Sequence, residues 1–316
     1  MIIGGGLAGL MTALRLAPMP AVVLAKAPLG AEASSGWAQG GIAAAIGPDN
    51  DPELHLADTL AAGDGLCDVA GRAADYGGGA GRHRNAASLR VRFDRVTTGA
   101  LSLGLEAAHA RRRIVHATGD GTGRAIMRAL SDAVRATPSI TVLEGLEARR
   151  VLVVDGAISG VLATSSSGTM LLPTGRAVIA TGGVGGLFLH STNPRGAFGQ
   201  GLALAMRAGA VLVDVEFVRF HPTALDTDSS PLTLVSEAVR SGGATLVDET
   251  GTRFIEMTPG KELAPRDVVA RAVWRHMSEG HRVFLDARHS LGSDFARHFP
   301  VIAASCAIAG IFVGLR

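Results

Sequence analysis

Three glycines near the start of the chain constrain its fold more than any other sequence feature. Gly4, Gly6 and Gly9 follow the pattern G-x-G-x-x-G, an apolar helical stretch continues at 11–16, and 21–24 is typical of a buried strand. Such a β-α-β start places a tight turn and a helix N-terminus where they can accept a pyrophosphate. The pattern predicts a dinucleotide site, with an ordinary glycine turn as the alternative. Only residues 1–3 precede it, fewer than the roughly five of an average strand.

Composition narrows the class of protein. The 316 residues are 47% hydrophobic and carry a net charge of +2 with histidine neutral. That is enough apolar sequence for one large or two moderate domains, and the charge does not favour nucleic-acid binding. Cys67 and Cys306 match neither a disulfide framework nor a metal spacing, so we expect buried thiols and no metal. The apolar segment 299–315 contains Pro300 and indicates a core helix rather than a membrane span, and no signal peptide is expected.

The polar positions after the first β-α-β unit do not fit an NAD site. NAD-binding sequences place an acidic residue about 20 positions after the glycines, whereas the polar residue here is Lys26. The stretch 34–43 combines small hydroxyl residues with a glycine pair between two apolar runs. It suits a loop that presents backbone N–H groups to a phosphate or a flat ring, with a simple Gly/Ser turn as the alternative. A dinucleotide other than NAD is therefore expected.

The glycine-rich start, Lys26 and the run S-S-G-W-A-Q-G-G-I-A-A resemble the FAD-binding part of the succinate dehydrogenase, fumarate reductase and L-aspartate oxidase superfamily. The resemblance implies an α/β fold: a Rossmann-like FAD-binding domain at 1–213 and an inserted α+β capping domain at 214–316, with the family's C-terminal helical domain absent. Ser34 stands where the membrane-complex branch has the histidine that carries covalent FAD. Non-covalent FAD is therefore the implied cofactor.

The resemblance also implies which residues contact FAD. The segment 176–183 is expected to be a buried strand ending in T-G-G, similar to a second flavin-binding strand. Between two later glycines the family usually has Asp, where this chain has Gln200. The implied cofactor-binding residues are Gly4, Gly5, Gly6, Leu7, Ala8, Gly9, Lys26, Ser34, Ser35, Gly36, Trp37, Ala38, Gln39, Gly40, Gly41, Ala148, Thr181, Gly182, Gly183 and Gln200.

The run 104–116 is the most diagnostic of the sequence. Glu106, His109 and Arg112 or Arg113 recur at helical spacing and could share one face, which without further information indicates a solvated charged face. The run closely resembles the L-aspartate oxidase signature and differs from the dehydrogenase segment. The resemblance implies that Glu106 orients the substrate ammonium, which would select an amino acid over a plain dicarboxylate.

The second half of the chain supplies the other candidate site residues. The segment 215–225 alternates like a strand that ends near His221, and Pro265 suits a helix start. A lone histidine is more often structural, but the family resemblance implies that His221 binds a substrate carboxylate. It also implies that Ser236 and Glu237 line the dicarboxylate site. Arg266 is implied as the active-site arginine, with proton transfer and carboxylate binding both open.

The resemblance implies that the protein oxidises L-aspartate to iminoaspartate, with O2 or fumarate as electron acceptor. This reaction is the first step of de novo NAD biosynthesis. We further expect that iminoaspartate is handed over to quinolinate synthase and that the protein is cytoplasmic. No nucleic-acid or membrane partner is expected. The segment 71–90 departs from the family pattern and suggests a frameshift or a surface loop. Because the family's later site residues are missing, an inactive truncated fragment is one alternative. A soluble fumarate-reductase-like flavoprotein is the other.

Overall fold

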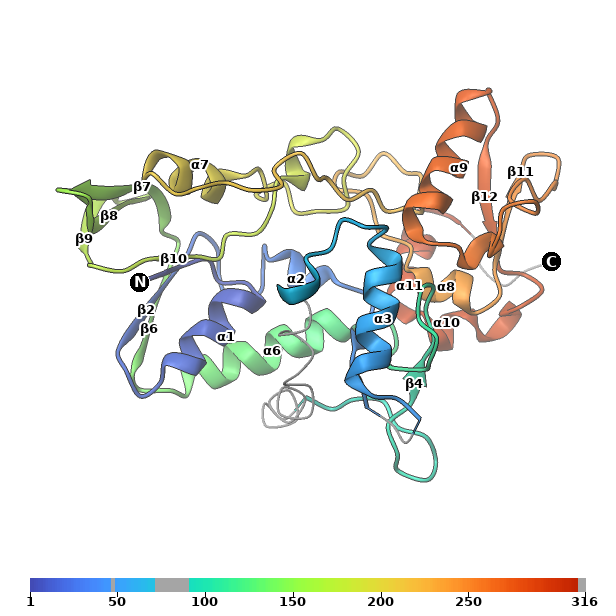
Figure 1. Cartoon of the computed structure of the whole chain (residues 1–316), viewed down its shortest axis with the longest axis horizontal. Coiled ribbons are helices and arrows are strands. Elements are labelled where there is room, and N and C mark those ends of the chain that lie inside the picture. The colour runs from blue at the N-terminus through green and yellow to red at the C-terminus, as the bar shows by residue number, and fades with distance from the viewer. Residues whose placement is uncertain (47–48, 72–90, 312–316) are drawn as a thin grey trace. The chain divides into compact units, whose positions relative to one another are not determined.

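The computed structural model describes residues 1–46, 49–71 and 91–311 (Figure 1). The chain divides into two compact units, each assembled from separate stretches. The first unit contains Met1–Ala38, Gly123–Val218 and Asp228–Leu232; the second contains Gln39–Thr122, Arg219–Thr227 and Thr233–Arg316. Much of the expected domain 1–213 thus lies in the second unit, and the boundary at 213/214 stays a prediction. The frameshift suggested for 71–90 falls, beyond its first residue, outside the described residues.

A parallel sheet forms the centre of the first unit. Its order is β10 (Val178–Ile179), β1 (Ile2–Ile3), β2 (Ala21–Ala25) and β6 (Ile140–Glu144). The two residues of β1 are buried and have a parallel neighbour on each side, so this strand forms despite its length. Side chains of β10 remain partly exposed, 40% at Val178 and 36% at Ile179. The expected buried strand at 176–183 is therefore wrong: only two residues pair, at the sheet edge.

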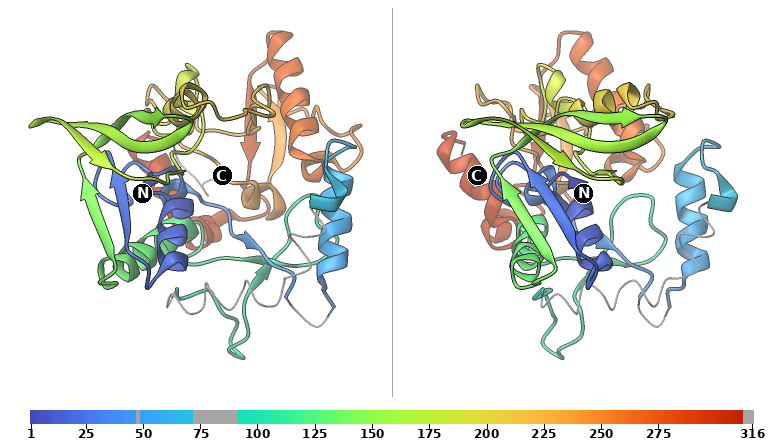
Figure 2. Two further views of the ribbon diagram at one scale, coloured as in Figure 1. Left: turned by 60° about the vertical axis from the view of Figure 1, so that its left-hand side comes forward. Right: turned by 90° about the vertical axis from the view of Figure 1, so that its left-hand side faces the viewer.

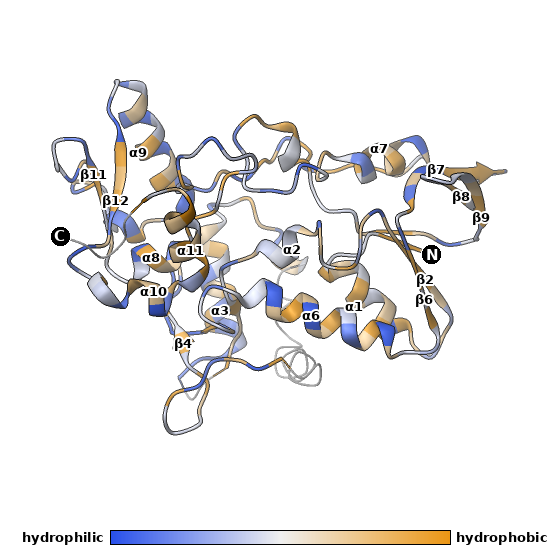
Figure 3. Cartoon of the chain, turned by 180° about the vertical axis from the view of Figure 1, so that it is seen from behind, coloured by the Kyte–Doolittle hydropathy of each residue, from blue (hydrophilic) through white to orange (hydrophobic). Residues whose placement is uncertain are grey.

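Two helices run beside each other next to this sheet, α1 (Leu7–Leu16) and α6 (Thr122–Arg135) (Figures 1 and 2). The helix α1 connects the parallel strands β1 and β2, which confirms the β-α-β start. In Figure 3, α6 alternates between hydrophobic and hydrophilic residues, whereas β2 and β6 are largely hydrophobic. Ile126, Leu130 and Val134 are the buried side of α6. The amphipathic pattern thus matches a helix that covers one side of the unit.

An antiparallel sheet completes the first unit. It consists of β7 (Glu147–Val154), β8 (Ala157–Ser165) and β9 (Gly168–Pro173) in that order. The turn between β7 and β8 contains Asp155 and Gly156, both with positive φ, which is the backbone of a two-residue hairpin. Val151 and Val161 from this sheet share a core with Leu24 of β2 and Leu204 of α7 (Gln200–Arg207). The remaining helices of this unit are α2 (Ser34–Trp37) and the 3-10 turn η1 (Gly185–Leu187).

The second unit contains two small antiparallel sheets and several helices. One sheet has the order β3 (Ile42–Ala43), β5 (Ile114–Val115) and β4 (Leu103–Gly104); the other pairs β11 (Thr245–Asp248) with β12 (Val283–Asp286). Its described residues form the helices α3 (Pro52–Ala62), α8 (Glu237–Ser241), α9 (Arg266–Ser278), α10 (Phe295–His298) and α11 (Pro300–Ile308), with the 3-10 turns η2 (Lys261–Leu263) and η3 (Gly292–Asp294).

Two hydrophobic cores lie among the described residues of the second unit. One of them contains three completely buried residues: Ile255, Leu246 of β11 and Val269 of α9. The other joins Val239 of α8 to Ile302 of α11. Pro300 is the first residue of α11, as suits a residue without an N–H. Of the core helix expected over 299–315, a helix is present at 300–308 with Ile302 and Cys306 buried and Ile308 89% exposed, and residues 312–315 lie outside the described chain.

Two expectations about the site segments are wrong. Residues 104–116 form no helix: β4 and β5 pair with each other, and Ala108 has a φ of +64° in the turn between them. Residues 215–225 form no strand, and their only ladder contact in the described chain is the isolated bridge from Ala224 to Leu234. Pro222 lacks the N–H that a continued ladder would need. Alternation of apolar residues was therefore insufficient without a neighbouring strand.

Candidate functional site

A cavity of about 480 Å³ lies in the first unit, at the ends of the parallel strands. Gly4 follows β1, Lys26 follows β2 and Thr181 comes shortly after β10, and all line this cavity. Ligands of open α/β sheets bind in the crevice outside the carboxyl ends of the strands. The predicted cofactor residues that line it are Gly4, Gly5, Gly6, Leu7, Ala8, Lys26, Ser34, Ser35, Ala148, Thr181, Gly182 and Gln200.

Close backbone contacts require two glycines of the motif, Gly4 and Gly9. Gly4 has a φ of +123°, and a Cβ there would lie 2.2 Å from the Ala180 carbonyl oxygen. A Cβ on Gly9 would lie 2.0 Å from the carbonyl oxygen of Gly4, so α1 can approach β1 only with glycine at this position. The first turn of α1 contains no acidic residue, and Gly6 at its N-cap provides no side-chain hydrogen bond. The helix end is thus open to an anionic group, as a pyrophosphate requires.

Polar side chains around the cavity are held by neighbouring groups. The Lys26 ammonium donates to the carbonyl of Gly196 and lies 5.5 Å from the centre of the Phe198 ring. Ser35 Oγ accepts the N–H of Leu7 at 3.3 Å. Gln200 Nε2 donates to the carbonyl of Ala148 at 3.0 Å. Gln200 therefore fixes the position of β7 beside the cavity, and its contact with a cofactor stays a prediction.

The other predicted cofactor residues do not line this cavity. Gly9, Gly36, Trp37, Ala38 and Gly183 lie in the first unit outside its lining, and Gln39, Gly40 and Gly41 belong to the second unit. A Cβ on Gly41 would lie 2.4 Å from the carbonyl oxygen of Val115. Close approach of β3 and β5 therefore requires this glycine independently of any ligand. The cofactor roles of these residues stay predictions.

A second cluster of candidate residues lies within the second unit. Arg266, the first residue of α9, donates from Nη2 to Glu106 Oε2 at 3.0 Å and from Nε to Glu237 Oε2. Glu237 also accepts the N–H of Ala107 at 2.9 Å. The side chains of Glu237 and Glu106 are only 1% and 9% exposed, whereas that of Arg266 is 31% exposed. Three residues far apart in the sequence thus form one buried, charged group.

Glu106 keeps one oxygen available in this group. Its Oε1 is buried and has no hydrogen-bond partner among the described residues. Burial raises the pKa of Glu106 and the negative charge of Glu237 raises it further, while Arg266 acts in the opposite direction. A buried, unpaired carboxylate oxygen is costly unless a donor satisfies it. The site can therefore accept a hydrogen-bond donor or a cation at Glu106.

Further basic groups act on the same cluster. Partial desolvation and the positive charge of Arg266 lower the pKa of Arg219, an exposed residue, and burial lowers that of Arg240, which lies 3.8 Å from Glu237 Oε2. Burial lowers the pKa of His221 to about 4 despite its hydrogen bond with the Thr223 carbonyl, so the ring is neutral at pH 7. These charges and His221 favour an anionic ligand. Arg219 and Arg240 were not predicted as site residues, although Arg219 precedes His221 by two residues and Arg240 follows Glu237 by one helical turn.

Ser236 has a structural contact in this cluster. It is the N-cap of α8, and its Oγ accepts the N–H of Ala238 at 3.3 Å. The helix it caps carries Glu237 and Arg240, so Ser236 helps to orient both side chains. Binding of a substrate carboxylate by its hydroxyl stays a prediction.

The basic run after Glu106 is not a uniform solvated face. Arg113 is completely buried, and its Nη2 lies 3.0 Å from Asp58 Oδ2 of α3, whereas Arg111 and Arg112 are exposed. Asp58 also accepts the N–H of Ala110 at 2.9 Å. The solvated-face alternative is therefore wrong for Arg113, which anchors the turn behind Glu106 to α3.

Comparison with known proteins assigns the family. Residues 1–311 match the family model described as "FAD binding domain". The chain belongs to this family. FAD is its cofactor, and the glycine turn, the open end of α1 and the cavity at the strand ends fit FAD.

Similar proteins refine this assignment. The chain is 57% identical over 312 residues to the L-aspartate oxidase of Mesorhizobium japonicum and 56% identical over 313 residues to that of Agrobacterium fabrum. These matches cover 98% of this chain but 60% and 59% of those relatives. The structure of a variant of E. coli quinol fumarate reductase FrdA matches with a TM-score of 0.88 at 26% identity, over 99% of this chain and 57% of that one. The chain thus spans about 60% of the length of the curated relatives it matches. Across the described residues, no helix has the length and apolar character to span a membrane.

Proposed function

We propose that this chain contributes to the FAD-dependent oxidation of L-aspartate to iminoaspartate. The proposal rests on the free Glu106 oxygen, buried beside Arg266 and Glu237. An amino dicarboxylate offers one ammonium and two carboxylates. Around Arg266 the protein offers the guanidinium groups of Arg219, Arg240 and Arg266 and the carboxylates of Glu106 and Glu237. Guanidinium groups outnumber carboxylates by one, which complements the single net negative charge of aspartate.

Each side chain has a role in this proposal. FAD, when bound, accepts a hydride from the substrate carbon. Glu106 binds and orients the ammonium, and Arg266 binds a carboxylate through its planar fork. His221 and Ser236 contact the carboxylates, with His221 as a neutral hydrogen-bonding ring because its pKa is about 4. Glu237 holds Arg266 and the backbone of Ala107 in place. Its place in the lining of the dicarboxylate site stays a prediction.

The wider role belongs to the same proposal. Relatives named L-aspartate oxidase support a place at the first step of de novo NAD biosynthesis. Oxygen or fumarate would then reoxidise the flavin, and iminoaspartate would pass to quinolinate synthase in the cytoplasm. A soluble fumarate-reductase-like activity is the second candidate, supported by the match to FrdA. Glu106 favours the amino acid, because a buried anion repels a plain dicarboxylate.

The visible spectrum of the purified chain tests this function. We expect bound flavin absorption that L-aspartate bleaches under anaerobic conditions, with release of the imine product. Bleaching by succinate but not by L-aspartate would support the fumarate-reductase-like candidate. Bound flavin that neither compound bleaches would contradict activity of this chain.

Arg266→Leu provides the second arm of the test. It removes the carboxylate-binding fork and leaves Glu106 and Glu237 without their shared cation. We expect turnover to be abolished while flavin absorption remains, because the FAD cavity lies in the first unit. Unchanged turnover in this variant would remove Arg266 from the mechanism.

A further inference from the structure

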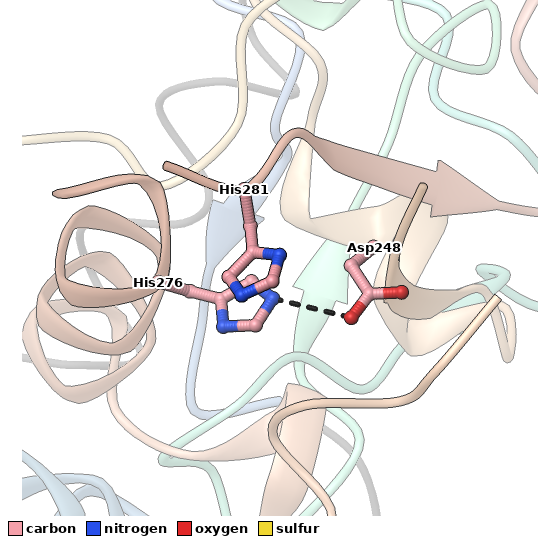
Figure 4. A group of neighbouring side chains, drawn as sticks. All are labelled: Asp248, His276 and His281. Atoms are coloured by element: carbon pink, nitrogen blue, oxygen red, sulfur yellow. Dashed lines mark ion pairs between the residues drawn. The ribbon is translucent and has the colours of Figure 1, made fainter. Parts of the chain in front are cut away.

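Two histidines and one aspartate meet in the second unit, outside the cluster around Arg266 (Figure 4). Asp248 ends β11, His276 lies in the last turn of α9, and His281 lies just before β12. The strands β11 and β12 are paired at Asp248 and Val283, which brings the two ends of this segment together. One potential ligand atom from each of the three residues lies within 4.8 Å of the other two.

The carboxylate of Asp248 is oriented by its own turn. Its Oδ1 accepts hydrogen bonds from the Thr250 N–H at 2.9 Å, from the Thr250 hydroxyl at 2.6 Å and from the Thr252 N–H at 3.0 Å. Its Oδ2 faces His276 Nε2 at 3.4 Å, and that buried nitrogen has no hydrogen-bond partner among the described residues. Two ligands on a tetrahedral ion with bonds of about 2.0–2.1 Å lie roughly 3.4 Å apart. The two facing atoms therefore have the separation of two metal ligands.

The two imidazole rings are stacked on each other. His276 is stacked between Phe254, with ring centres 4.3 Å apart, and His281, at 4.2 Å. His281 Nδ1 lies 2.9 Å from Glu249 Oε1, and the other oxygen of Glu249 accepts the N–H of Arg282 at 2.9 Å. Metal-ligating histidines commonly have such a carboxylate partner, which fixes the ring. The turn thus fixes the Asp248 carboxylate and stacking holds His276, whereas the ring of His281 lies nearly parallel to that of His276, at 10°, and this half-exposed side chain turns out of the stack to bring its nitrogen to the same ion.

We propose that Asp248, His276 and His281 bind a divalent first-row transition-metal ion such as Zn²⁺. Imidazole nitrogen suits this class of ion, whereas Mg²⁺ and Ca²⁺ prefer oxygen ligands throughout. The ion joins the end of α9 to the β11–β12 pair. Arg266 is the first residue of α9, so the site holds the opposite end of the helix that carries it. The sequence spacing did not indicate this site because the ligands come from three separate elements.

Zinc binding to the whole chain tests the site. Titration calorimetry with ZnCl2 on chelator-treated protein is expected to give one site whose affinity falls at least about tenfold in His281→Ala, since even outer partners of metal-bound histidines contribute 10–100-fold. His281 is half-exposed, so this variant is a mild change. His289→Ala, an exposed histidine of the same unit, is the matched control and should keep full affinity. Equal zinc affinity in His281→Ala and the wild type would overturn the proposal.

Two further measurements separate a built site from scattered surface binding. X-ray absorption of the zinc-loaded chain should show imidazole nitrogen at about 2.0–2.1 Å. Zinc should raise the Tm of the wild type and of His289→Ala but not that of His281→Ala or His276→Gln. Spectra without imidazole ligands, or an equal rise in Tm for all four proteins, would show that these histidines bind no metal. Addition of MgCl2 in place of zinc is expected to leave the Tm unchanged.

Discussion

Glu106 is the residue whose charge separates an amino acid from a plain dicarboxylate in the proposed site. Replacing it with Gln keeps its shape but removes the charge that faces the ammonium. Hydrogen bonds to charged groups contribute about 1.5–3 kcal/mol, so the KM for L-aspartate should rise about 10- to 100-fold. Steady-state kinetics measure this change, with flavin absorption unchanged. Glu53→Gln, an exposed acid in α3, is the control and should leave KM as it is.

The pH dependence of kcat/KM for L-aspartate provides a second test of Glu106→Gln. Burial raises the pKa of Glu106, so its protonated form is present at a higher pH than for an ordinary glutamate. Since the ammonium needs the ionised carboxylate, kcat/KM for L-aspartate should fall as pH decreases through this raised pKa. The acid limb should disappear in Glu106→Gln. An identical acid limb in both proteins would assign it to another group.

Protonation of His221 is expected to lower the free energy of unfolding at acid pH. Its pKa is about 4 in the folded chain against an ordinary value of 6.5, so the folded state disfavours the protonated ring. The resulting stability is complete above pH 6.5 and is lost as pH falls toward 4, with a loss of about 2 kcal/mol at pH 5. Urea unfolding at pH 7 and pH 5 should therefore show a smaller difference for His221→Asn than for the wild type. Equal differences would mean that His221 is free to protonate in the folded chain.

At the scale of elements, the contact between α1 and β1 depends on Gly9. A Cβ there would lie 2.0 Å from the Gly4 carbonyl oxygen, so Gly9→Ala must displace the helix or the glycine turn. Such overpacking typically costs about 1–3 kcal/mol, and the displaced turn should bind less FAD. Urea unfolding and the flavin content per chain measure both effects. Gly175→Ala, with no atom within 4 Å of its added Cβ and no positive φ, should change neither.

The helix α11 depends on a cap that is distant in sequence. Asp120 is 3% exposed, and its two oxygens accept the N–H groups of Val301 at 3.0 Å and Ile302 at 2.9 Å. Asp120→Ala leaves both donors without a partner and should cost about 1–3 kcal/mol of unfolding free energy. Asp132→Ala, an exposed position of α6, is the control. If both variants unfold at the same urea concentration, the cap does not stabilise α11.

The wrong predictions at this scale share a physical cause. Charged residues at helical spacing suggested a helix over 104–116, but pairing of β4 with β5 decided the backbone there. Alternating apolar residues suggested a strand over 215–225, but no ladder forms along that segment in the described chain. Both patterns are local, whereas strand pairing depends on a neighbour elsewhere in the chain. The helix start predicted at Pro265 was correct, since α9 begins at Arg266, because the hydrogen bonds of a helix are internal to it.

For the molecule as a whole, the cavity proposed to hold FAD is lined by residues of the first unit. Bound FAD should therefore stabilise that unit, by about 2.7 kcal/mol when FAD is present at 100 times its Kd. Hydrogen exchange with and without FAD should show the largest protection at residues 4–8, 25–35 and 180–182. Removal of FAD by dialysis should abolish this additional protection. Protection confined to the second unit would place the cofactor elsewhere.

Features that depend on neighbouring residues could be predicted from the sequence. The spacing of the glycine motif defined the turn before α1, because only glycine permits the close backbone contacts found at Gly4 and Gly9. The charged site, in contrast, depends on long-range packing. Glu106 lies in the turn between β4 and β5, Glu237 in α8 and Arg266 at the start of α9. No local rule relates three such positions, because their contact requires the cores of the second unit to bring these elements together.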